Sequence, residues 1–452
     1  MSVDSLGKSG TCFNNWSKTY SCTPELYFEP ETTEEIKQIL CYASEKGKKV
    51  KTVGCGHSPS DLACTTDFMI SMARYNRVLK IDKEKLQVTV QGGCLIKDLN
   101  EVILPENGMA FSTQGTVSSL TAAGVISTGT HGSGANFSNI SASVVDLELM
   151  LSSGEIIKVS NTENAELLPV VSLSLGSVGV ILSITFQCER AFNLHWKQYP
   201  DTLGNVMENL DSYVDGCEHF RLIWYPHTES VVCYTINRTN QIPNAKPSWF
   251  WEVLVGYHLF QFILWISTFI PRLVPLINRL HFTVFGNIEA EKVDRSDLIF
   301  NFDCLFKQYV MEWAIPREKT GVVLFELKEW LERTRFPAHL PVEVRFVKGD
   351  KNYLSPCYQQ DSCYINIIMY RPFNKLVSHE AYWTAYQNIM AKHGGRPHWA
   401  KDHKYSGAEF QSLYPKWKEF CQARETLDPN GMFLNSNLER VFGMKPSNSY
   451  IV

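Results

Sequence analysis

Two glycine-rich stretches in the first third of the chain constrain its fold most strongly. The first, GCGHSPS at residues 54–60, follows the strand-like KVKTV, and the second is AAGVISTGTHGSG at residues 122–134. Glycines leave successive backbone N–H groups unobstructed, and the neighbouring hydroxyls add further donors, which suits a pyrophosphate. Two such loops in one domain predict a long phosphate-containing ligand lying between them.

The first loop is not one of the common nucleotide-binding motifs. Gly54 and Gly56 are followed by Pro59, so the third glycine of G-x-G-x-x-G is missing, and no smooth passage into a helix follows. The pattern therefore disfavours a Rossmann dinucleotide site. The stretch also lacks the G-K-[ST] ending of a P-loop.

His57 lies inside this loop and has three interpretations. It can be a loop histidine bonded to a backbone carbonyl. A metal ligand is the weaker interpretation, because no other His or Cys lies at a suitable spacing. The third interpretation is a nucleophilic imidazole that becomes attached to a cofactor. Composition alone does not decide among them.

Charge and cysteine usage exclude several classes of protein. The chain of 452 residues has 43 basic and 47 acidic residues and no nucleic-acid-binding motif, so nucleic acid is excluded as a partner. The 13 cysteines show no close C-x-x-C pairs, which favours reduced, mostly buried thiols and no metal site. No signal sequence is recognisable at the start, so we expect four N-x-S/T sequons to be unused. These are at Asn15, Asn136, Asn139 and Asn237.

The hydrophobic patterning predicts an α+β protein of two domains, residues 20–190 and 191–452. A capping box of Thr32 and Glu35 opens a helix that ends near Gly47, and a second helix is expected to stop at Pro105. Alternating residues on either side of Ser153-Gly154 predict a hairpin. In the second domain, PVEVRF and SCYINIIMY have strand character.

Residues 253–270 form a run of eighteen residues without a formal charge, followed by Pro271 and Pro275. A transmembrane helix needs about 20 apolar residues, so this run is at the short end, and Arg272 and Arg279 interrupt its continuation. An interfacial or hairpin-like membrane association of residues 250–285 is favoured over a clean span. A buried core helix is the alternative.

Two further stretches bring together acids and cations. Glu343 and Arg345 are two apart on the predicted strand PVEVRF, so both side chains face the same way. RPHWAK gathers His398 and Lys401 within a few residues. Each stretch in isolation also fits a solvated surface; together they offer a proton acceptor and cations for developing negative charge.

At these stretches the sequence resembles the sugar-1,4-lactone oxidases of the vanillyl-alcohol-oxidase flavoprotein class. The similarity covers nearly the whole chain, through GHSPSDLACTTDFMI, NRVLKIDKEKLQVTV, GTHGSG, EWAIPREKT, PVEVRF, SCYINIIMYRP, GGRPHWAK and LDPNGMFLNS in order. It implies a two-domain fold with an FAD-binding domain of the PCMH type and a substrate domain with an antiparallel sheet and helices. It also implies FAD attached covalently through its 8α carbon to His57.

The resemblance assigns further cofactor contacts. They are Gly54, Cys55, Gly56, Ser58, Pro59, Gly124, Ser127, Thr128, Thr130, His131, Gly176, Gly179 and Ile181. One departure is Cys55, which stands where a third glycine is expected and whose backbone is less free.

The resemblance places Glu343, Arg345, His398 and Lys401 around substrate and flavin. His398 is expected to help accept the hydroxyl proton, although the base is not assigned. Gly115 is implied to leave a path for O2, which favours an oxidase, and Thr116 beside it is implied to contact substrate.

The implied reaction is oxidation of L-gulono-1,4-lactone at C2 by O2 to ascorbate and hydrogen peroxide, at the endoplasmic reticulum membrane. Three alternative functions stay open. The protein can oxidise arabinono- or galactonolactone instead, it can be a dehydrogenase that hands electrons to a carrier, or it can be an inactive flavin-fold binding protein.

Overall fold

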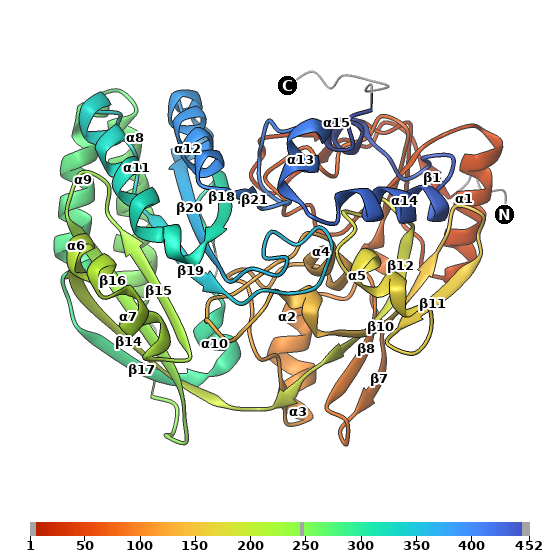
Figure 1. Ribbon diagram of the computed structural model, residues 1–452, viewed down its shortest axis with the longest axis horizontal. Coiled ribbons are helices and arrows are strands. Elements are labelled where there is room, and N and C mark those ends of the chain that lie inside the picture. Colours follow the sequence, from red (N-terminus) through yellow and green to blue (C-terminus); the bar gives the residue numbers. More distant parts are fainter. Residues whose placement is uncertain (1–5, 245–247, 303, 445–452) are drawn as a thin grey trace.

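A computed structural model describes residues 6–244, 248–302 and 304–444 (Figure 1). The first part of the chain builds two sheets. The smaller has the strand order β1 (Gly7–Lys8), β4 (Leu26–Phe28), β6 (Phe68–Ser71) and β5 (Val50–Val53). β6 pairs in parallel with both β4 and β5, and helix α1 (Thr33–Glu45) buries Ile36, Ile39 and Leu40 in the same core. β5 ends directly before the first glycine loop.

The second sheet of this part is antiparallel. Its order is β11 (Ile156–Ser160), β10 (Val144–Met150), β12 (Val180–Gln187), β8 (Gln87–Gln91) and β7 (Val78–Asp82). The predicted hairpin joins β10 to β11, and Gly154 has φ +80° at its turn, a conformation that glycine adopts without strain.

The second half of the molecule is built on an eight-stranded sheet whose pairings are all antiparallel. Its order is β17 (Ala290–Arg295), β14 (Asn193–Thr202), β16 (Ser230–Thr239), β15 (His219–Trp224), β19 (Val342–Val347), β20 (Ser362–Tyr370), β18 (Gln308–Pro316) and β21 (Arg396–Pro397). The predicted α+β class with an antiparallel sheet in the second domain is confirmed.

Side chains alternate across this sheet as a period of two requires. Val342 and Val344 of β19 enter a core with helices α11 (Thr320–Thr334) and α12 (Glu380–Lys392). Glu343 and Arg345 face the opposite side, toward the first half of the molecule. The sheet therefore has one apolar face and one face that carries charged groups.

Shorter elements complete the described part of the chain. The helices are α2 (Ile96–Asp98), α3 (Leu104–Glu106), α4 (Ala122–Ser127), α5 (Leu168–Val171), α6 (Leu203–Glu208), α7 (Leu210–Asp215), α8 (Phe260–Ser267), α9 (Val274–His281), α10 (Ser296–Phe300), α13 (Gly407–Leu413), α14 (Trp417–Leu427) and α15 (Ser436–Val441). The remaining strands form two pairs, β2 (Phe13–Asn14) with β3 (Ser21–Cys22), and β9 (Met109–Ala110) with β13 (Glu189–Arg190).

The helix predicted to stop at Pro105 ends at Glu106, one residue later. α2, a π-helical turn over Leu99–Ile103 and α3 follow one another without a break and form one helical stretch. Pro105 lies in the last turn of this stretch, as expected for a residue that removes an N–H donor from a helix.

The C-terminal helices return to the first half of the molecule. Phe410, Phe420 and Leu438 share a hydrophobic core with strands β8, β10 and β12. In Figure 1 the dark blue α13, α14 and α15 lie beside the red and yellow elements. One division near residue 190 therefore does not separate the two cores, because residues from about 407 onward pack with the first.

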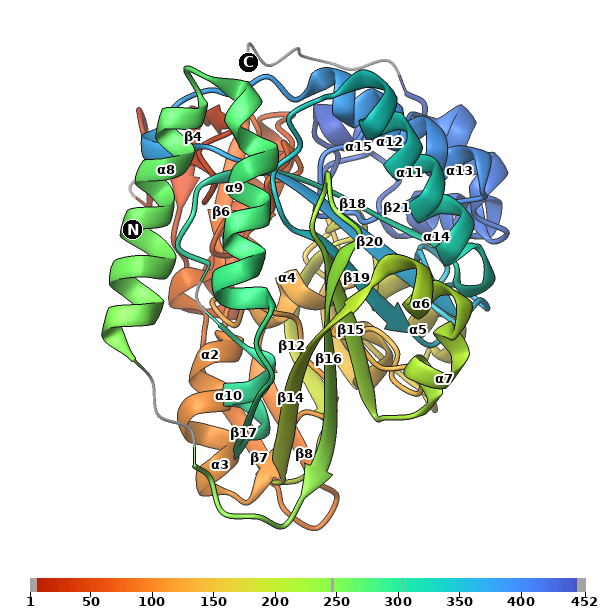
Figure 2. The ribbon, with the colours of Figure 1, turned by 90° about the vertical axis from the view of Figure 1, so that its left-hand side faces the viewer.

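The apolar segment forms a helical hairpin. A π-helical stretch (Phe250–Leu259) leads into α8, a short turn at Pro271 follows, and α9 runs back beside α8 (Figure 2). Phe260, Leu264 and Ile277 pack onto the large sheet, whereas Trp249 is 65% exposed and Trp251 and Phe269 are also exposed. Within the described residues, no helix is both long and apolar enough to cross a membrane.

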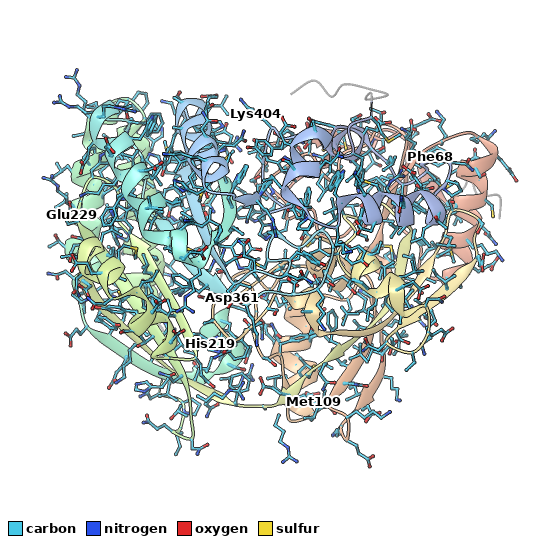
Figure 3. The ribbon with its side chains drawn as sticks, in the orientation of Figure 1. Phe68, Met109, His219, Glu229, Asp361 and Lys404 are labelled. Carbon is cyan, nitrogen blue, oxygen red and sulfur yellow. The ribbon has the colours of Figure 1, made fainter. Side chains whose placement is uncertain are left out.

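The two halves meet through residues on either side of the second glycine stretch. His219 of β15, labelled in Figure 3, donates a hydrogen bond to the carbonyl of Ser133 at 2.7 Å. Gly134 N–H donates to Phe346 O at 2.6 Å, which extends β19. This contact places the second glycine stretch beside the charged face of the large sheet.

Candidate active site

A cavity of about 520 Å³ lies between the two glycine stretches and the charged face of the large sheet. This volume is typical of small-molecule and cofactor sites. The structure brings every predicted site residue to the lining of this cavity, while their roles stay predictions. They are His57, Gly54, Cys55, Gly56, Ser58, Pro59, Gly115, Thr116, Gly124, Ser127, Thr128, Thr130, His131, Gly176, Gly179, Ile181, Glu343, Arg345, His398 and Lys401.

The loop after β5 packs tightly against the second glycine stretch. A Cβ on Gly54 would lie 2.1 Å from Thr121 Oγ1, so only glycine fits there. Gly56 has φ +64°, a conformation that favours glycine. Cys55 has no such torsion and places its Sγ 3.0 Å from Ser119 O. The departure from glycine at position 55 is therefore accommodated by the backbone.

His57 is half-buried in the middle of this loop. Burial, followed by the nearby charges of Lys401 and Lys307, lowers the pKa of its imidazole to about 4. The ring is therefore neutral at physiological pH. A neutral imidazole carries the lone pair that a nucleophile needs.

Gly115 is confined by its neighbours. A Cβ at this position would lie 2.7 Å from Thr130 Cγ2, and the Gly115 carbonyl accepts a hydrogen bond from Asn301 Nδ2 at 2.7 Å. An alanine there would press on Thr130, which also lines the cavity. The side chain that glycine lacks would thus occupy space at the cavity wall.

At the opposite wall, Glu312 of β18 is a buried carboxylate between two cations. Arg345 donates a hydrogen bond to its Oε1, and Lys401 Nζ lies 3.7 Å from its Oε2. Burial alone would raise the pKa of Glu312, but Arg345, His131 and Lys401 together hold it well below its usual range. Glu312 therefore stays ionised and pairs with both cations.

Glu343 is a second carboxylate in the cluster and is less buried. Its Oε1 lies 3.4 Å from Arg221 Nη1, and its Oε2 lies 3.7 Å from Arg345 Nε. These are longer ion pairs than that of Glu312, so Glu343 keeps acceptor capacity toward the cavity.

The two cavity histidines present different nitrogens. His398 Nδ1 accepts a hydrogen bond from the N–H of Ala400 at 3.1 Å, so the proton of its neutral ring is on Nε2. His131 Nδ1 donates to Gly132 O at 2.9 Å, which leaves its Nε2 with the lone pair. Burial lowers the pKa of both rings, and nearby cations add to this effect against the opposing charge of Glu312. His398 is thus a hydrogen-bond donor, contrary to the expectation that it accepts the substrate proton.

Three functional candidates were missed by sequence reasoning: Glu312, Lys51 and Trp16. Glu312 is a lone charge in the otherwise apolar strand QYVMEWAIP, which is a signal that could have revealed it. Lys51 of β5 is 3% exposed, lines the cavity and donates to Leu175 O at 3.0 Å. Trp16 stacks on His57, a contact that no sequence pattern predicts.

His131, Glu312 and His398 also form the one group of three possible metal ligands among the described residues. Their ligand atoms lie within 4.8 Å of one another. The carboxylate is already paired with Arg345 and Lys401, and both cations would repel a metal ion. We therefore assign this group to charge compensation.

Comparison with known proteins explains this arrangement. A model of the D-arabinono-1,4-lactone oxidase family matches residues 184–441, which is more than half of the chain. The chain belongs to this lactone oxidase family. A model of an FAD-binding domain matches residues 24–160, which contain both glycine stretches.

Individual members of the lactone oxidase family match nearly the whole chain. An L-gulonolactone oxidase of Scyliorhinus torazame is 50% identical over 96% of this chain and 99% of its own length. The L-gulonolactone oxidase of Bos taurus is 49% identical over the same shares. An L-gulono-1,4-lactone dehydrogenase of Mycobacterium tuberculosis is 33% identical over 95% of this chain and 99% of its own.

Solved structures support the fold. A solvent-stable cholesterol oxidase superposes with a TM-score of 0.80 over 97% of this chain and 98% of its own, at 18% identity. The cholesterol oxidase of B. sterolicum gives a TM-score of 0.79 over 96% and 97%, at 16% identity. At these identities the likeness shows a shared two-domain flavoprotein fold.

Proposed function

We propose that this protein oxidises the C2 hydroxyl of L-gulono-1,4-lactone and passes the electrons to O2. The products are hydrogen peroxide and a 2-keto lactone that tautomerises to L-ascorbate, so the reaction completes ascorbate biosynthesis. One observation carries the proposal: Glu343, Arg345 and Lys401 line the same cavity as both glycine stretches. Support also comes from relatives named L-gulonolactone oxidase at 48–50% identity.

The cavity fits FAD on two observations of the chain itself. At one end, Gly176 has φ +65°, and a Cβ there would lie 3.6 Å from the buried ammonium of Lys51, a group suited to a phosphate. At the other end, the charged groups of the large sheet face His57 across the same space. The two glycine stretches would hold the dinucleotide between these ends. FAD would supply the hydride acceptor and the reaction with O2.

The residues around the substrate have distinct tasks in this proposal. Arg345 and Lys401 would stabilise the negative charge that builds up on the hydride acceptor. Glu343 accepts hydrogen bonds from lactone hydroxyls, and His398 donates one through Nε2–H. The Nε2 lone pair of His131 lies 3.4 Å from Glu312 Oε1, so a proton that this nitrogen accepts would be stabilised by the carboxylate.

We further propose that His57 forms the 8α-histidyl bond to FAD. Its neutral ring supports this, because an imidazolium has no lone pair with which to form the bond. The bond would fix the flavin beside the substrate groups.

We also propose that the outer face of the α8–α9 hairpin associates with the endoplasmic reticulum membrane. Exposed Trp249, Trp251 and Phe269 are the residue types that prefer the membrane interface. Gly256 and Tyr257 of the same segment line the cavity, so the membrane-associated surface would adjoin the active site.

The test begins with protein purified from detergent-solubilised membranes. L-gulono-, D-arabinono- and L-galactono-1,4-lactone are offered in air, and peroxide and lactone consumption are measured. Peroxide equal to the lactone consumed, with the highest kcat/KM for L-gulono-1,4-lactone, is the expected result. Turnover that needs an added dye acceptor would identify a dehydrogenase, and no turnover with any lactone would leave a binding protein.

The covalent bond has a separate test. After acid precipitation, yellow flavin is expected to stay with the wild-type chain and to leave it in His57→Ala. Flavin released from the wild type would contradict the bond while leaving lactone oxidation intact.

A further inference from the structure

The chain segment around the β2–β3 pair lies against the loop that carries His57. Trp16 N–H donates to Gly56 O at 2.8 Å, and Asn15 Nδ2 donates to Ser58 O at 3.1 Å. These two carbonyls belong to the residues directly before and after His57. The segment therefore holds the backbone of His57 from both sides.

The indole of Trp16 also contacts the imidazole itself. The two ring centroids are 4.9 Å apart and the planes are inclined by 18°, which is a stacked arrangement. Stacking on a large flat ring limits rotation of the imidazole about its Cβ–Cγ bond, a torsion that is otherwise broad. The direction of the imidazole nitrogens is thereby restricted.

Trp16 is held in turn by the second half of the molecule. The ammonium of Lys307, directly before β18, lies 4.2 Å from the centroid of the indole and also donates a hydrogen bond to Trp16 O. Arg371 donates to Ser17 O at 2.6 Å and to Lys18 O at 3.1 Å. Lys307 and Arg371, two cations from the second half of the molecule, thus fix a segment that packs on the first half.

We propose that Trp16, anchored by Lys307, is a positioning residue that orients His57 for covalent attachment to FAD. This inference rests on the proposed 8α-histidyl bond. In that step an imidazole nitrogen bonds to the 8α carbon, while the methyl group loses a C–H bond and the imidazole its N–H. The two electrons and two protons released pass to O2 and give hydrogen peroxide, so the step is balanced.

Lys307 has a second effect on the same ring. Burial first, and then the positive charges of Lys401 and Lys307, oppose protonation of His57. Trp16 therefore supplies the orientation of the ring, and Lys307 contributes to keeping the ring neutral. Both conditions apply to a nucleophile that reacts once, during maturation of the protein.

The test compares Trp16→Leu, Trp16→Phe and Lys307→Met with the wild type, each expressed and purified in the same way. Total bound FAD is measured by absorbance after gel filtration, and covalent FAD by the flavin that stays with the acid precipitate. Trp251→Leu is the matched control, because this exposed indole contacts Phe250 and Phe285 edge to face and makes no ring contact with His57.

Trp16→Leu is expected to keep total bound FAD while its covalent fraction falls about fivefold or more, since a misplaced reacting group costs rate steeply. Trp16→Phe restores most of the covalent fraction because a phenyl ring also stacks, and Lys307→Met falls in between. A wild-type covalent fraction in Trp16→Leu would overturn the inference. A parallel loss of total and covalent FAD in both Trp16 variants would overturn it as well, because Trp16 would then only support folding. Absence of covalent FAD in the wild type would instead refute the His57 bond.

Discussion

At the scale of single residues, the cations around the cavity are paired with carboxylates at one end and unpaired at the other. Glu312 pairs with Arg345 and Lys401, and Glu343 pairs with Arg345 as well. Lys51, by contrast, makes no ion pair among the residues that the structure describes, and its ammonium is held by the carbonyl of Leu175. Burial lowers the pKa of Lys51 to about 7. A buried cation without a carboxylate is costly in the empty protein and favourable once a phosphate lies beside it.

Lys51→Met therefore has opposite effects on the two forms of the protein. In a His57→Ala background, where FAD can be removed and restored, the dissociation constant for FAD should rise about tenfold or more. The apoprotein should gain about 1–3 kcal/mol of unfolding free energy at pH 7. An unfolded lysine titrates near 10.4, so between pH 7 and 10 the unfolded wild type binds more protons than the folded one. Wild-type stability then rises with pH, and the advantage of the variant shrinks toward pH 10.

Urea unfolding at both pH values and a fluorescence titration with FAD measure these effects. Lys158→Met, an exposed lysine on β11, is the control and should change neither quantity. A destabilised Lys51→Met apoprotein with unaltered FAD affinity would contradict the assignment.

The two carboxylates of the cluster should separate stability from substrate binding. Glu312→Gln keeps the shape but leaves Arg345 and Lys401 without their buried counter-charge, so unfolding free energy should fall by about 3 kcal/mol. Glu343→Gln removes the charge of a more exposed group and should lower the unfolding free energy by less than about 1 kcal/mol. Its KM for lactone should rise more than that of Glu312→Gln, because Glu343 faces substrate in the proposal. Melting curves measure the stability of both variants, and steady-state kinetics measure their KM. A Glu343→Gln variant that is less stable than Glu312→Gln would refute the role of Glu312.

At the scale of elements, patterns within one segment predicted what that segment does. The capping box of α1 is present, with Glu35 N–H donating to Thr32 Oγ1 and Thr32 N–H to Glu35 Oε2. The β10–β11 hairpin formed where glycine permits its turn. The alternation of PVEVRF placed Glu343 and Arg345 on one face. Each of these features depends on residues that are close in sequence.

Features that depend on distant partners were not predicted. Glu312 matters because Arg345, 33 residues later, donates to it across the sheet. Trp16 and Lys307 meet from positions nearly 300 residues apart. Tertiary packing decides such contacts, so one sequence without structure does not contain them in readable form.

The α8–α9 hairpin allows a prediction about the membrane. Replacing exposed Trp251, Phe262 and Phe269 together with serine should leave the melting temperature within about 2 °C, since these side chains are outside the core. Binding to liposomes of phosphatidylcholine and phosphatidylserine, measured by flotation, should fall sharply because the interfacial aromatic residues are gone. Leu264→Ala, on the buried face, is the counterpart and should cost about 2–4 kcal/mol of stability. Undiminished flotation of the triple variant would exclude this face as the membrane contact.

At the scale of the whole molecule, both ends of the described chain converge on the loop that carries His57. Near the start, Asn15 and Trp16 bond to the carbonyls on either side of His57. Near the end, Asn435 Nδ2 donates to the carbonyls of Leu62 and Cys64, each at 2.8 Å. The loop at 54–64 is therefore also fixed by Asn435, which is about 370 positions away in sequence. Residues after 407 accordingly pack with the first core, although the lactone oxidase family model matches residues 184–441 as one stretch.

Asn435→Ala tests whether the C-terminal segment supports the loop that carries His57. The side chain is 3% exposed and also caps α15 by accepting from Leu438 N–H at 3.0 Å. Its loss leaves two carbonyls and a helix end without a partner, so unfolding free energy should fall by about 2–4 kcal/mol. FAD affinity, measured in the His57→Ala background, should fall as well, because the loop at 54–64 loses its support. Asn435→Asp separates the two tasks: it restores the cap but cannot donate, so stability should recover in part while FAD affinity stays low.

Asn107→Ala is the control. It removes a single hydrogen bond to the carbonyl of Ile103, away from the cavity, and should weaken stability slightly without changing FAD affinity. If Asn435→Ala and Asn107→Ala behave alike toward FAD, the C-terminal segment stabilises the first core without shaping the cofactor site.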